Sequence, residues 1–145
     1  MDILKNRMKL KDLSVNIYSL HDKIKSPHHL PASMIINSDT SEFGDGEHWV
    51  SIYVDTDKNV FYFDTFGVIL DPVYQNIASW GSSFRPMIYN KKHIQHPFST
   101  LCGSYCVMFV GYMYNGLSFL SFLNIFGNDY KVNDTIVRNF ISKIK

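Results

Sequence analysis

A long apolar stretch, residues 107–123, follows a polar loop and constrains the fold more than any other part of this chain. Gly111, Asn115, Gly116 and two serines interrupt the stretch, so its pattern predicts buried helices and not a membrane span. Cys102 stands where the first of these helices begins. We therefore expect a central helix whose first turn carries a cysteine.

The composition predicts one globular domain, residues 1–145, because a hydrophobic content of 46% suffices for a core and argues against disorder. A net charge of +1 provides no strong electrostatic attraction to nucleic acid. Two cysteines fit a reducing compartment better than a disulfide scaffold. No signal peptide is apparent at Met1, so we expect a protein that is not secreted.

Two segments rich in β-branched and aromatic residues, 49–54 and 60–63, flank a run of turn residues and predict a β-hairpin. Residues 34–37 form a further predicted strand, and 86–89 and 93–95 are weaker candidates.

Helices are predicted on both sides of these strands. Leu10, Leu13 and Ile17 have the spacing of an amphipathic helix within 1–20. Asp71 and Pro72 form a typical helix start, with Asp71 as the cap. The predicted helices after that point are 71–80, 101–115, 117–126 and 134–144, the last capped by Asn133 or Asp134. The fold class expected is α+β: a small, mostly antiparallel sheet with flanking helices.

The side chains of a cysteine hydrolase occur in this chain. Cys102 at the first turn of a helix lies at the positive end of the helix dipole, which favours a thiolate. The hairpin pairing would bring His48 close to Asp64, as a base and the group that orients it. Gln95, seven residues before Cys102, is a candidate oxyanion donor. Each polar residue also has an ordinary interpretation, as a surface His, a turn-forming Asp or a loop Gln.

A zinc site is the alternative for the same region. His93, His96, Cys102 and Cys106 offer four ligands of the kinds zinc uses. Both cysteines, however, lie on a strongly apolar predicted helix without a glycine-rich knuckle. We therefore expect no metal, and we expect Cys106 to be a core residue.

Four motifs and one glutamine follow one another with a recognisable spacing. They are Ser26-Pro27-His28-His29-Leu30, Gly46-Glu47-His48-Trp49, Phe63-Asp64-Thr65-Phe66-Gly67, and Cys102-Gly103-Ser104-Tyr105-Cys106-Val107-Met108-Phe109, preceded by Gln95. In this combination the chain resembles the adenovirus-type maturation proteases (adenain-like), relatives of the proteases specific for SUMO and ubiquitin-like proteins.

The resemblance implies a cysteine endopeptidase with Cys102 as nucleophile, His48 as general base, Asp64 as its orienting partner and Gln95 as oxyanion donor. It also implies that Trp49 and Gly103 belong to the substrate channel, and that Trp49 helps to shape a narrow passage that favours glycine next to the scissile bond. The implied reaction is thiolate attack on a peptide carbonyl, followed by a thioester intermediate and its hydrolysis.

The chain departs from the adenoviral enzymes in its shorter length and in a compressed region after Phe109. Those enzymes are activated by a disulfide-linked peptide and by DNA, whereas only Cys102 and Cys106 are present here and the charge is near neutral. The sequence therefore does not support a peptide or DNA activator, and we expect no cofactor. It resembles instead the minimal enzymes of virophages and self-synthesising DNA transposons.

The resemblance implies viral capsid or core precursors as substrates, the virion and the infected host cell as location, no membrane partner and a monomer. Two alternatives remain open. One is a protease of the same superfamily acting on ubiquitin-like conjugates. The other is a non-enzymatic, zinc-stabilised binding module.

Overall fold

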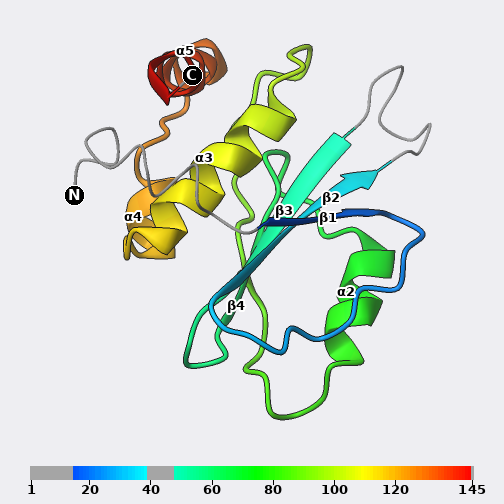
Figure 1. The fold of residues 1–145 in the computed structure, drawn as a ribbon. Helices are drawn as coiled ribbons and strands as arrows, with labels where there is room; N and C mark the ends of the chain where they lie inside the picture. The colour runs from blue at the N-terminus through cyan, green and yellow to red at the C-terminus, as the bar shows by residue number, and fades with distance from the viewer. Residues whose placement is uncertain (1–14, 39–47, 145) are drawn as a thin grey trace.

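The computed structural model describes residues 15–38 and 48–144. These residues form five strands and four helices, with most of the strands before most of the helices (Figure 1). They are β1 (Val15–Ser19), β2 (Ala32–Ser38), β3 (His48–Val54), β4 (Val60–Phe63), α2 (Asp71–Ala78), β5 (Ile88–Tyr89), α3 (Cys102–Tyr114), α4 (Phe119–Leu123) and α5 (Tyr130–Ile144).

The strands form one sheet in the order β1-β2-β3-β4-β5. The three central strands are antiparallel, and a parallel strand lies at each edge. The hairpin of β3 and β4 is confirmed, with Val54 opposite Val60 and Ser51 opposite Phe63. Its register places the first residue of β3 and the residue after β4 at the same end of the hairpin.

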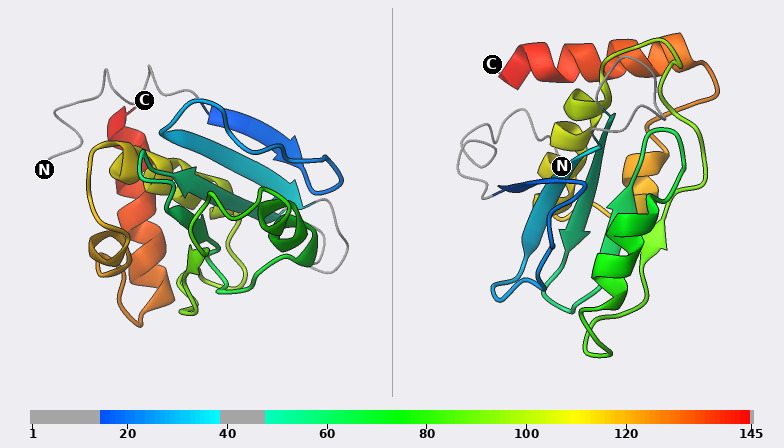
Figure 2. Two further views of the ribbon diagram at one scale, coloured as in Figure 1. Left: turned by 90° about the horizontal axis from the view of Figure 1, so that it is seen from below. Right: turned by 90° about the vertical axis from the view of Figure 1, so that its right-hand side faces the viewer.

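Helices cover both faces of the sheet, α2 on one side and α3, α4 and α5 on the other (Figures 1 and 2). Alternate residues of β3 divide between two cores. Val50 and Ile52 pack with Val73 of α2, whereas Tyr53 packs with Phe109 of α3. The expected α+β class, with a central helix that begins at Cys102, is confirmed.

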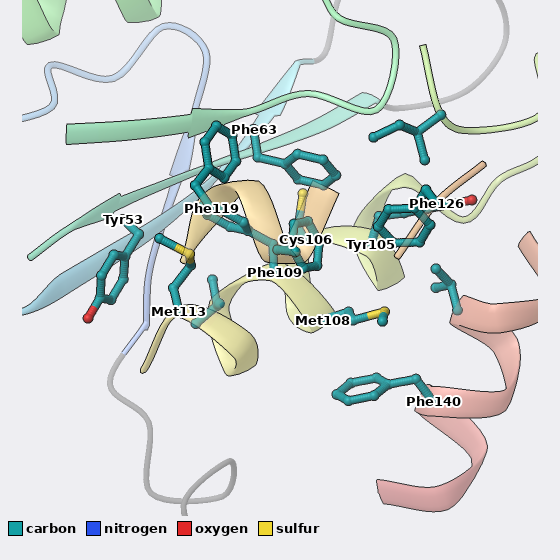
Figure 3. Packing of buried hydrophobic residues seen from close by; sticks show 14 of the residues in the cluster. Tyr53, Phe63, Tyr105, Cys106, Met108, Phe109, Met113, Phe119, Phe126 and Phe140 are labelled. Carbon is teal, nitrogen blue, oxygen red and sulfur yellow. The ribbon is translucent and has the colours of Figure 1, made fainter. Parts of the chain in front are cut away.

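The larger core is aromatic (Figure 3). The Phe63 ring stacks on Phe109, with centroids 5.2 Å apart, and meets the edge of Phe122 at 5.1 Å. This packing holds β4 against α3 and α4, so it fixes the end of the hairpin relative to the start of the central helix.

Several predicted elements were wrong in place or kind. Within the predicted helix 1–20, residues 15–19 form strand β1 and pair with β2. The predicted strand 93–95 is not a strand, because Ile94 donates its N–H to Thr65 O in a loop. Residues 1–14, with Leu10 and Leu13, lie outside the described residues.

The helix caps also differ from the prediction. Leu70, not Asp71, precedes the first turn of α2, without a side-chain cap, and the helix ends at Ala78. Helix α5 begins four residues earlier than the predicted 134, because Asp129 Oδ1 accepts the N–H groups of Lys131 and Val132. No helix in the described part of the chain has the length and apolar character to cross a membrane.

Candidate active site

Cys102 is the first residue of α3 and is 4% exposed. The helix starts here because Tyr105 N–H already bonds Leu101 O, which closes the first turn. The backbone N–H groups of a first helical turn point away from the helix and attract negative charge. Cys102 therefore carries its thiol where the helix favours an anion.

His48 and Asp64 meet at the end of the hairpin, as the sequence predicted. His48 opens β3, Asp64 follows β4, and His48 Nε2 lies 2.6 Å from Asp64 Oδ1. Both side chains are buried, at 2% and 0% exposure. The Cys102 side chain lies close enough to His48 to help raise the pKa of the imidazole. Because His48 Nε2 bonds Asp64, Nδ1 is the ring nitrogen that can bond the Cys102 thiol.

The backbone of the following loop fixes the Asp64 carboxylate. Oδ1 accepts the N–H of Phe66 and Oδ2 that of Val68, each at 3.0 Å. Asn90, which the sequence analysis missed, binds Asp64 from the other side: its Oδ1 accepts Asp64 N–H, and its Nδ2 donates to Asp64 O at 2.6 Å. The carboxylate consequently has a single orientation, toward His48.

Gly67 makes this loop possible. Its φ is +70°, and an added Cβ would lie 2.4 Å from Lys91 O, so no other residue fits without moving the backbone. The ring of Phe66, next to it, stacks on His48 with centroids 5.0 Å apart. The loop therefore fixes both the carboxylate and the face of the imidazole.

Burial lowers the pKa of His48, but the hydrogen bonds and negative charges of Asp64 and Cys102 outweigh burial and raise the pKa to about 9. The imidazole therefore stays protonated at neutral pH. Since the folded state holds this proton more tightly than the unfolded chain, the resulting stabilisation is complete below pH 6.5 and is lost as the pH rises through about 9.

We expect the His48 ring to titrate with a midpoint near pH 9, measured by NMR on protein with labelled histidine. The free energy of unfolding should fall across the same range in the wild type. The variant His48→Gln should lack this component, so the difference between the two proteins isolates it. A midpoint at or below 6.5 would show that Asp64 and Cys102 do not hold the proton.

Gln95 is fully buried beneath the loop before Cys102. Its Oε1 accepts the Thr65 hydroxyl at 2.6 Å, and its Nε2 donates to Ser99 O and Ser99 Oγ at 2.9 and 2.8 Å. Since Ser99 O is only an acceptor, the amide nitrogen must face the loop that leads to Cys102. The amide is therefore held in one orientation.

Helix α5 holds the same loop through two polar residues that had been predicted as caps. Asn133 Nδ2 donates to Ile94 O at 3.0 Å, and Asp134 Oδ1 accepts the Tyr105 hydroxyl at 2.7 Å and, more weakly, His96 N–H at 3.4 Å. These bonds connect α5 to both sides of Gln95. Local sequence patterns do not predict this role, because the partners are 29 to 39 residues away.

Trp49 and Gly103, the predicted channel residues, face each other. A Cβ built on Gly103 would lie 3.5 Å from Trp49 Cδ1, so the indole rests on the first turn of α3. Cys106 is 1% exposed in the core (Figure 3), and burial raises the pKa of its thiol. The prediction that Cys106 is a core residue is confirmed.

The geometry does not assemble the alternative zinc ligands. Within residues 15–38 and 48–144, no three His, Cys, Asp or Glu side chains lie close enough to hold a metal. The His93 ring packs between Phe66 and Tyr130, with centroids 4.9 and 4.8 Å away. His96 Nδ1 instead accepts the N–H of Phe98.

Comparison with solved structures places the fold. The chain is similar to ChlaDub1 from Chlamydia trachomatis, with a TM-score of 0.55 and 15% identity over 98% of this chain and 74% of that one. The central domain of the uncharacterized protein Lpg1148 from Legionella pneumophila also aligns, with a TM-score of 0.45 and 13% identity over 97% of both chains. Neither a family model nor a curated protein matches the sequence.

The likeness to ChlaDub1 shows that the two proteins share a fold. Nothing in this likeness is specific to the adenovirus branch, so that part of the resemblance stays a prediction.

Proposed function

We propose that this protein is a cysteine endopeptidase that uses Cys102 as its nucleophile. The observation that carries the proposal is the buried, hydrogen-bonded series Asp64, His48 and Cys102 at the N-terminus of α3. A nucleophile bonded to a base that a third group orients is the arrangement that covalent catalysis requires.

The chemistry proceeds in two halves. The Cys102 thiolate attacks the peptide carbonyl carbon, and the His48 imidazolium gives its proton to the departing amine, which leaves a thioester. His48 then takes a proton from water as the water attacks the thioester, and the Cys102 thiolate departs to release the carboxylic acid. The raised pKa of His48, about 9, supports the first half because the acid is already charged at neutral pH.

The developing oxyanion would be bound by backbone N–H groups of the first turn of α3 and by Gln95. At present Gln95 Nε2 donates to Ser99 O and Ser99 Oγ. Gln95 Nε2 can give up its bond to the Ser99 hydroxyl in favour of the oxyanion. The oxygen of that hydroxyl keeps a partner, because it also accepts the N–H of Leu101 at 3.4 Å. The amide nitrogen, already held on this side of the loop, can then donate to the developing charge, which favours the transition state over the substrate.

The substrate proposed from the resemblance is a viral capsid or core precursor, cut next to glycine during maturation of the virion in the infected cell. The Trp49 indole lies in van der Waals range of the position that a Gly103 Cβ would take, and the resemblance makes this pair the wall of the channel that favours glycine. The protein is proposed to act as a monomer.

A second substrate class is favoured by the fold. ChlaDub1, which shares it, is a deubiquitinase, so the same site could act on conjugates of a ubiquitin-like protein. Such substrates also present glycine at the scissile bond, so both substrate classes would fit the same narrow channel beside Trp49.

The test treats one sample of the protein with iodoacetamide and incubates a second, untreated sample with each of the two substrate classes. We expect mass spectrometry to find alkylation at Cys102 and none at Cys106, whose thiol is 1% exposed. Cleavage of capsid precursors, with intact ubiquitin-like conjugates, would support maturation, and the reverse result would support the second class. The absence of both alkylation at Cys102 and cleavage of any substrate would refute the peptidase.

A further inference from the structure

Three consecutive residues of the loop after β4 each contact a side chain of the candidate site. Asp64 Oδ1 lies 2.6 Å from His48 Nε2, and the Phe66 ring stacks on the same imidazole. Between them, Thr65 donates its hydroxyl to Gln95 Oε1 at 2.6 Å. One short loop therefore contacts both the base and the candidate oxyanion donor.

The backbone around Gln95 is fixed without the Thr65 side chain. Thr65 O accepts the N–H of Ile94 at 2.7 Å, and Ile94 O accepts Asn133 Nδ2 at 3.0 Å. Neither hydrogen bond involves the Thr65 hydroxyl. The hydroxyl therefore acts on the amide group of Gln95 and not on the path of the chain.

The two ends of the Gln95 amide have different partners. Nε2 donates to Ser99 O and Ser99 Oγ, and the second of these bonds is the one given up for the oxyanion. The hydrogen bond from Thr65 is made at the carbonyl end, so it persists while the N–H changes its partner. A hydroxyl that donates to an amide oxygen also polarises the amide, which makes its N–H group a stronger donor.

We propose that Thr65 is a positioning residue for the reaction, whose hydroxyl orients and polarises the Gln95 amide that stabilises the oxyanion. The inference rests on the proposed function and adds a residue to it. Thr65 is 0% exposed, so it acts through Gln95 and not by contact with the substrate. Without the hydroxyl, Gln95 Oε1 would be buried without this donor, and the amide would lose the bond that orients it at the carbonyl end.

The first test is kinetic and uses a peptide with a central Gly-Gly as substrate. Thr65→Val removes the hydroxyl and keeps nearly the same shape. We expect kcat to fall about tenfold with KM within about twofold of wild type, because the oriented amide acts on the developing charge and not on the bound substrate. Thr65→Ser keeps a hydroxyl and should retain kcat within about threefold of wild type.

Ser51→Ala is the matched control. It removes a hydroxyl that is also 0% exposed but belongs to β3, outside the loop that contacts Gln95. We expect kcat and KM of this variant to equal those of the wild type. A loss of activity confined to Thr65→Val would then be due to its position and not to the removal of a buried hydroxyl as such.

A double-mutant cycle connects Thr65 to Gln95. Gln95→Ala should lower kcat about 10²-fold, as expected for the loss of one oxyanion donor. Adding Thr65→Val to it should lower kcat no further, since the amide to be oriented is absent. Alkylation of Cys102 by iodoacetamide forms no oxyanion, so its rate should be the same in Thr65→Val and in the wild type.

The orientation of the amide is measured independently of turnover. By NMR, the side-chain N–H signals of Gln95 should exchange with deuterium oxide at least about tenfold faster in Thr65→Val than in the wild type. Wild-type kcat in Thr65→Val, or an equal loss of kcat in the presence and absence of Gln95, would overturn the inference. Failure of the proposed function looks different: the wild type hydrolyses no peptide, and the exchange rates alone then decide whether Thr65 orients Gln95.

Discussion

Replacing Cys102 with alanine should abolish peptide hydrolysis and leave the fold in place. Without the sulfur no thioester can form, and activity should drop by at least about 10⁴-fold, to the limit of detection. Cys102 is the first residue of α3, and its replacement leaves the aromatic packing of Phe63 and Phe109 untouched. The rate of substrate cleavage, with circular dichroism to check the fold, measures this outcome.

Cys106→Ser is the matched control, because it removes the only other thiol of the chain. The Cys106 side chain lies beside the buried Ser51 hydroxyl, which can accept the new hydroxyl group, so the protein should fold and retain activity. Activity that survives in Cys102→Ala but disappears in Cys106→Ser would show that the nucleophile had been assigned to the wrong cysteine.

The parts of the site that the sequence predicted are those fixed by local pattern. Strand residues on both sides of a turn define the β3–β4 hairpin, and the hairpin alone brings His48 to Asp64. The apolar run after Cys102 defines α3. Both signals lie within a few residues of the groups they position, so they can be read without knowledge of the tertiary structure.

The supports of the site were not predictable, because they act over long distances in the sequence. Asn90 binds the backbone of Asp64 across 26 residues, and Asn133 reaches Ile94 across 39. Taken alone, each looks like a turn former or a helix cap. Strand β1 is a similar case: Ile17 has helical spacing with Leu10 and Leu13, but pairing with β2 decides the conformation of residues 15–19.

Asp64→Asn replaces one carboxylate oxygen of the site with an amide nitrogen. Three donors converge on the carboxylate: His48 Nε2 and Phe66 N–H on Oδ1, and Val68 N–H on Oδ2. An asparagine has one acceptor oxygen, so its amide group must face at least one of these donors with another donor. We expect the free energy of unfolding to fall by about 3 kcal/mol and kcat to fall by at least about 10²-fold. Without the carboxylate, the pKa of His48 should fall from about 9 toward or below 6.5, since burial then dominates.

Asp57→Asn, an exposed change of the same charge in the same hairpin, is the control and should alter none of these quantities. A variant Asp64→Asn whose His48 still titrated near 9 and whose kcat stayed within about threefold of wild type would exclude Asp64 as the group that orients the base.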